Sequence, residues 1–166
     1  QYLGENRHEE AFMLAEKVTK HYLDPAVQAL PATLKTELNL LAARVYFHKK
    51  LYQNALKLIN TRLNRGWSDS PDYWQWLYCM LRLMIQYELG NADYLEYEIK
   101  NLSRRLKKAS ATPVFSEWLT MLQRLLTQQK KRPEPISATP NPQIQKLSQW
   151  LPFEEWIREK SLKQQG

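Results

Sequence analysis

The strongest constraint on the fold comes from two stretches in which a helix, a short polar break and a second helix follow one another. The first stretch covers residues 43–59 and breaks at Lys49-Lys50. The second covers residues 87–99 and breaks at Gly90-Asn91. In both, small and aromatic residues stand where two helices would press together. Such hairpins are the unit of stacked helical repeat proteins, so the pattern predicts an all-α fold and indicates binding rather than chemistry.

The composition agrees with a folded helical protein. The 166 residues are 43% hydrophobic with six Trp and nine Tyr, whereas Gly occurs only four times and strand-like alternation is absent. The longest apolar run, residues 74–89, is about one turn short of a bilayer span and contains polar side chains, so it predicts a core helix and no membrane contact. The lone Cys79 does not decide the compartment, so we take the cytoplasm as the default.

Apolar spacing and helix-stop residues divide the chain into helices. Asp24-Pro25, Gly66 and Gly90 are stop signals, and Ser70-Pro71 and Thr112-Pro113 are start signals. The helices are expected at about residues 5–23, 33–48, 51–65, 71–89, 92–108 and 113–129. These six form a repeat domain over residues 1–129. The first helix matches the second half of a repeat, so we expect the parent protein to continue N-terminally with more repeats.

The composition changes after residue 129. Four prolines within residues 133–142 predict an extended linker over residues 130–145. Residues 146–166 then form an amphipathic C-terminal segment with a helix at about 152–162, rich in apolar side chains such as Trp150, Phe153, Trp156 and Ile157. We expect this segment to dock on the last helices as a cap with Trp156 as its main anchor. The competing interpretation is a free motif that awaits a partner.

The hairpins resemble the tetratricopeptide repeat (TPR) family. The resemblance rests on Lys50-Leu51-Tyr52-Gln53-Asn54-Ala55 with Ile59 one turn on, on Ala43 and Tyr46 in the preceding helix, and more loosely on Gly90-Asn91, Leu95 and Ile99. Equivalent positions Ala11, Ala55 and Leu95 are 44 and 40 residues apart, longer than the family's 34. The resemblance implies antiparallel hairpins stacked as a short TPR-like α-solenoid. A looser similarity to Bacteroidetes repeat proteins implies no function.

In the TPR family the first helix of each pair lines a concave groove that binds peptides or helices. Carried over by position, the resemblance implies that a partner contacts residues of two helices: Glu37, Leu40, Arg44, Phe47 and His48 in one, and Met84 and Tyr87 in the other. Some members clamp a C-terminal carboxylate with a Lys and an Asn. Leu40 and Arg44 stand at those positions here, so that activity is not expected. The alternative is that several of these side chains merely pack on neighbouring helices.

The chain is basic, with a formal net charge of +7. Its positive residues concentrate in runs at 104–108 and 130–132, both at expected helix ends, where cations complement the helix dipole. We interpret them mainly as solvated helix ends, and nucleic-acid contact is the alternative. Five aromatic residues cannot all lie on one helix face, so most are expected in the core, and a partner contact by one or two of them is the alternative: Trp67, Tyr73, Trp74, Trp76 and Tyr78.

No catalytic or metal-binding constellation is visible. His8, His21 and His48 fall on different expected helices, Cys79 lies in the most apolar helix, and the four glycines are isolated. We expect no catalytic, cofactor or metal site and no enzymatic activity. The favoured function is a non-catalytic scaffold that binds another protein through the solenoid groove. A nucleic-acid-associated basic domain and a structural segment packing on its own chain are the alternatives, and the oligomeric state stays open.

Overall fold

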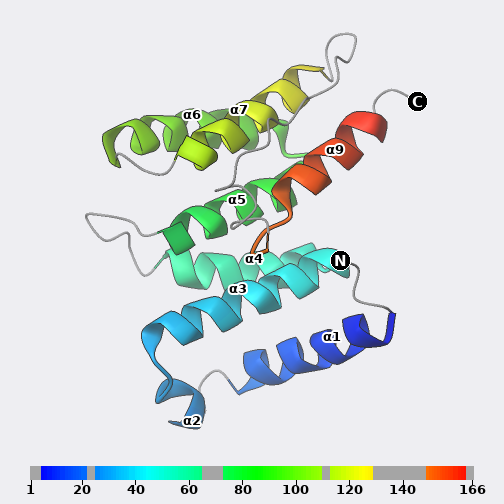
Figure 1. The fold of residues 1–166 in the computed structure, drawn as a ribbon, viewed down its shortest axis with the longest axis vertical. Coiled ribbons are helices and arrows are strands. Elements are labelled where there is room, and N and C mark those ends of the chain that lie inside the picture. Colours follow the sequence, from blue (N-terminus) through cyan, green and yellow to red (C-terminus); the bar gives the residue numbers. More distant parts are fainter. Residues whose placement is uncertain (1–4, 22–24, 65–72, 110–112, 129–148, 164–166) are drawn as a thin grey trace. The chain divides into compact units, whose positions relative to one another are not determined.

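The computed structural model describes residues 5–21, 25–64, 73–109, 113–128 and 149–163, and within these it is all-α (Figure 1). The described chain divides into two compact units, residues 1–85 and 86–166, and the boundary falls inside one helix. The predicted linker and the start signals at residues 70–71 and 112 lie outside the described residues. None of the helices in the described ranges is long and apolar enough to cross a membrane.

The first unit contains four helices and most of a fifth. They are α1 (Glu5–Lys20), α2 (Pro25–Gln28), α3 (Ala32–His48), α4 (Tyr52–Leu63) and α5 (Tyr73–Glu88), which continues into the second unit. The predicted helices match these bounds to within about three residues wherever both ends are described. The short helix α2 was not predicted. Helix α1 packs on α3, and α3 packs on α4 (Figure 1).

The turn between α3 and α4 ends α3 with a Schellman motif. Lys50 adopts a left-handed φ of 59°, and its N–H donates to the Phe47 carbonyl oxygen at 2.9 Å. The Leu51 N–H donates to the Tyr46 carbonyl oxygen at 2.8 Å. These two bonds satisfy carbonyl groups that the helix end leaves free and reverse the chain within three residues. Ala43 and Ala55, the small residues on either side of this turn, are both fully buried, as the sequence predicted.

Helix α5 is buried nearly all the way round between Trp74 and Ile85, as its continuous apolar sequence predicts. Its Tyr78 hydroxyl donates to the Thr36 carbonyl oxygen at 2.7 Å and lies 3.1 Å from Asn39 Oδ1. This contact fixes α5 against the middle of α3. The fully buried Tyr78 thus has its polar atom satisfied, as a buried phenol requires.

The second unit is built on α6 (Ala92–Ala109), α7 (Pro113–Gln128) and α9 (Phe153–Lys163). A second Schellman motif precedes α6. Gly90 has a φ of 74°, its N–H donates to the Tyr87 carbonyl oxygen, and the Asn91 N–H donates to the Gln86 carbonyl oxygen, both at 3.0 Å. Helices α6 and α7 pack side by side, and α9 packs on α7 (Figure 1).

Docking of the C-terminal helix is confirmed for the described residues. Phe153 is fully buried and stacks on Trp118 of α7, with ring centroids 4.8 Å apart. The Trp156 ring meets Tyr87 edge-on at 5.2 Å, and its Nε1–H donates to Glu88 Oε1 at 2.7 Å. Phe153 therefore shares the anchoring role that was predicted for Trp156 alone. Burying each large aromatic is worth about 1.5–3 kcal/mol.

Candidate binding surface

The apolar spacing of α6 decides which of its side chains face outward. Leu95, Ile99, Leu102 and Leu106 recur at intervals of four and three residues and are all buried. This period places them on one face of the helix, which packs on α7. The side chains on the other face are therefore left for solvent or a partner.

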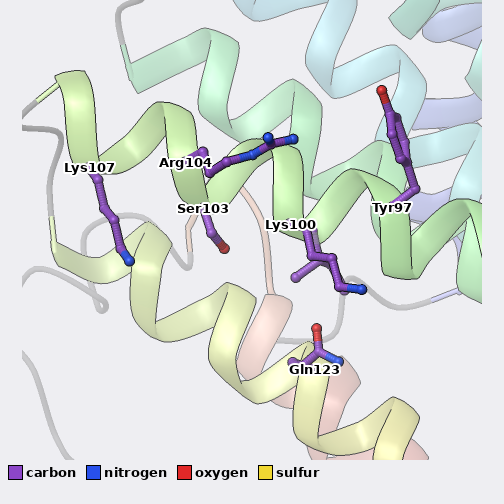
Figure 2. A pocket seen from close by; sticks show the side chains of 7 residues that line it. Tyr97, Lys100, Ser103, Arg104, Lys107 and Gln123 are labelled. Atoms are coloured by element: carbon purple, nitrogen blue, oxygen red, sulfur yellow. The ribbon is translucent and has the colours of Figure 1, made fainter.

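An open groove of about 530 Å³ lies between α6 and α7 in the second unit (Figure 2). Its buried floor includes Ile99. In Figure 2, Lys100, Ser103 and Lys107 point from α6 toward the α7 side, and Gln123 points back from α7. The polar and aromatic residues that line it are Tyr97, Lys100, Ser103, Arg104, Lys107 and Gln123.

Two features distinguish this groove from an ordinary polar surface. Tyr97 is 66% exposed, the largest exposed fraction among the exposed large apolar side chains of the described residues. Lys100, Arg104 and Lys107 are also exposed, and none of them forms an ion pair with a described carboxylate. An exposed aromatic ring beside unpaired cations offers both apolar area and charge to a ligand.

Five side chains of α3 were predicted to line the groove, and only some of them reach the surface. Leu40 is 0% exposed, since it lies on α3 beside the region that Tyr78 of α5 covers. Arg44 is partly buried, and this burial lowers the pKa of its guanidinium. Glu37 and Phe47 are half-buried, and only His48 is exposed. The Phe47 ring lies 5.8 Å from the Tyr52 ring, so it packs on the hairpin.

The second helix of the predicted groove, α5, contributes little to the surface. Met84 is 1% exposed, and the half-buried Tyr87 packs edge-on against Trp156 of α9. A partner could reach Leu40 or Met84 only if helices moved apart. The partner-contacting role of the remaining predicted residues stays a prediction.

The residues considered for chemistry are dispersed in the described structure. Cys79 is fully buried, and His21 and His48 are exposed on separate segments, while the side chain of His8 lies outside the description. Within the described ranges no three His, Cys, Asp or Glu side chains come together as metal ligands would. Of the aromatic group, Trp74, Trp76 and Tyr78 are buried, which confirms the expectation of core packing, and Tyr73 is partly exposed.

The sequence reasoning missed the α6–α7 groove. Arg104 and Lys107 were noticed only as members of the basic run 104–108. The available signal was the spacing of Tyr97, Lys100, Arg104 and Lys107, which are three, four and three residues apart. Comparisons with family models, with curated proteins and with solved structures find no match to this chain.

Proposed function

We propose that this chain is a non-catalytic protein-binding module and that the α6–α7 groove receives a segment of another protein. The observation that carries the proposal is that the exposed Tyr97 and three cations without an ion-pair partner among the described residues line one groove together with the buried Ile99. Tyr is favoured at interfaces because its large ring adds contact area while few torsions must be fixed on binding. The TPR-like pattern of the hairpins adds support, since repeat proteins of this kind present helix faces to partners.

Packing around the groove supports a preformed site. Helix α6 begins directly after the Schellman turn at Gly90, and α7 is held on its other side by the stacked rings of Trp118 and Phe153. A surface whose supporting helices are fixed in this way loses little conformational entropy on binding. The predicted residues Glu37, Phe47 and His48 on α3 remain candidates for a second contact area.

Site-specific photo-crosslinking tests the proposal. Benzoylphenylalanine in place of Tyr97 keeps an aromatic ring at the groove, and the same substitution at Leu162, 61% exposed on α9, is the matched control. In extract from the source cells, position 97 should give a protein adduct of discrete mass that excess wild-type protein abolishes, and position 162 should not. Adducts at neither position, or equal adducts at both, would contradict the proposal. An adduct formed only within the chain would favour the structural-segment alternative.

A second candidate, nucleic-acid association, is favoured by the alignment of Lys100, Arg104 and Lys107 on one side of α6. Binding through phosphates weakens steeply as salt rises. A gel-shift titration with single-stranded DNA over increasing salt tests it, and no shift at low salt rules it out.

A further inference from the structure

The outward face of α6 has a charge polarity. Asp93, Tyr97, Lys100, Arg104 and Lys107 follow one another at intervals of four, three, four and three residues, and we call them the α6 stripe. This spacing keeps all five on one side of an α-helix. At 1.5 Å per residue the stripe is about 21 Å long, and its three cations occupy roughly the last 10 Å. The stripe is therefore acidic at its start, aromatic next and basic over its last two turns.

At the positive end of the stripe, Lys100, Arg104 and Lys107 form no ion pair with a described carboxylate. The groove lining contains no carboxylate. Glu98 on the same helix is buried and accepts a hydrogen bond from Asn101 Nδ2 at 3.4 Å, away from the groove. Like charges three and four residues apart destabilise a helix, so Lys100, Arg104 and Lys107 carry a mutual repulsion. A bound anion at this position would relieve the repulsion.

We propose that the occupant of the α6–α7 groove is an acidic peptide segment of a partner protein. Its carboxylates pair with Lys100, Arg104 and Lys107, and an apolar side chain of the peptide lies on the exposed Tyr97 ring. This inference rests on the proposed function and adds the chemistry of the partner. Opposite charges of this kind accelerate association and set the orientation of the bound segment.

The polarity of the stripe favours a peptide over a nucleic acid. A nucleic-acid strand carries a negative charge at every nucleotide, so a strand that followed α6 past Tyr97 would meet Asp93, with Glu96 one turn before Lys100. A peptide can change its charge from one residue to the next. It can therefore place carboxylates at the basic end and a neutral or basic residue beside Asp93.

Fluorescence anisotropy with a defined probe tests the inference. The probe is a labelled peptide of about twelve residues, long enough to reach from Lys107 past Tyr97, with Glu at every third or fourth position and a Leu near one end. Two comparison probes are used. One is the same peptide with Gln in place of each Glu, and the other is an oligodeoxythymidine of the same formal charge as the acidic peptide. The test variant is Lys100→Gln/Arg104→Gln/Lys107→Gln. The matched control is Lys17→Gln/Lys20→Gln/Lys57→Gln, at three exposed lysines of the first unit.

Both variants remove three positive charges from the net charge of +7, so only the position of the loss differs. The acidic peptide should bind the wild type, and the groove variant should weaken binding about ten-fold, as expected for three exposed ion pairs. The control variant should weaken it by less than about two-fold, since its charges lie on other helices. The Gln peptide should bind no better than background.

Three results would overturn the inference: equal weakening by the two triple variants, equal binding of the Glu and Gln peptides, or binding of oligodeoxythymidine without binding of the acidic peptide. The circular-dichroism spectrum of the groove variant checks that α6 remains folded. A failed peptide titration together with a specific protein adduct at position 97 refutes the acidic partner and leaves the protein-binding function standing. Failure of both experiments refutes both.

Discussion

Replacing Trp156 with Phe tests the polar part of the contact that holds the C-terminal helix, although the smaller ring also buries less area. The substitution keeps an aromatic ring near Tyr87 but removes the Nε1–H that donates to Glu88 Oε1 at 2.7 Å. Glu88 also pairs with Lys160 of α9, and both side chains of this pair are mostly buried. The carboxylate therefore keeps one partner after the substitution, which limits the cost.

The magnitude follows from this arrangement. A hydrogen bond to a charged group is worth about 1.5–3 kcal/mol, and retention of Lys160 brings the expected loss to about 1–2 kcal/mol. That loss multiplies the open population of α9 by a factor of about 5–30. Because α9 can open without global unfolding, the appropriate measurement is amide hydrogen exchange of the peptide that covers residues 153–163. Its exchange rate should rise by this factor.

Leu162→Ala on the same helix is the control, since Leu162 is exposed and its truncation removes little buried area. Its exchange rate should stay within about two-fold of the wild type. If Trp156→Phe exchanges like the wild type, or if Leu162→Ala accelerates exchange as much, the Trp156–Glu88 contact does not hold α9. Either result would refute the reasoning.

Four further substitutions test the two turns, the first hairpin and the start of α9. Lys50→Gly should raise the free energy of unfolding by up to about 1 kcal/mol because Lys50 has a left-handed φ. Gly90→Ala should lower the free energy of unfolding by a similar amount because Gly90 also has a left-handed φ, even though an added Cβ would meet no neighbouring atom. Urea denaturation measures both changes, and two changes of the same sign would contradict this account. Ala55→Leu should lower the urea midpoint by the equivalent of about 1–3 kcal/mol because Ala55 is fully buried, and an unchanged midpoint would contradict close packing there. The pKa of Glu154 is raised mainly by burial and further by the negative charge of Glu117. Ionisation of Glu154 therefore destabilises the fold as pH rises through this raised pKa. Glu154→Gln should therefore melt higher than wild type at pH 7, with the advantage disappearing below the ordinary carboxyl pKa; a difference that does not change with pH would sink this account.

Local signals were enough to predict the helices and the packing of the small residues Ala43 and Ala55 in the first hairpin. Periodic apolar positions and stop signals placed α3 and α6 to within one residue at each end, because their ends combine a change of pattern with a chain reversal. Helix α2 was missed since a helix of four residues is too short to show a period. The docking of α9 could be predicted because so much aromatic area would be unfavourable in water.

The candidate site was predicted less well, because burial depends on which helix covers which face. Leu40 and Met84 were placed on an open groove by analogy with the TPR family, yet both are buried. The bond from the Tyr78 hydroxyl to the Thr36 carbonyl shows why for Leu40: α5 lies against that part of α3. No local sequence signal reports such a contact between residues 42 positions apart.

The position of the basic surface follows from the same periodicity that packs α6. Helix α6 carries two rows of side chains with the same four-and-three spacing, on nearly opposite sides of the helix. The buried row includes Leu95, Leu102 and Leu106, and the exposed row includes Tyr97 and Arg104. The register in which α6 packs on α7 therefore sets the direction in which its cations point. The consecutive run 104–108 hides this relation, because neighbouring residues point around the helix and Leu106 within the run is buried. Spacing along the helix, rather than the density of positive charge, thus identifies the residues that can act together on one partner.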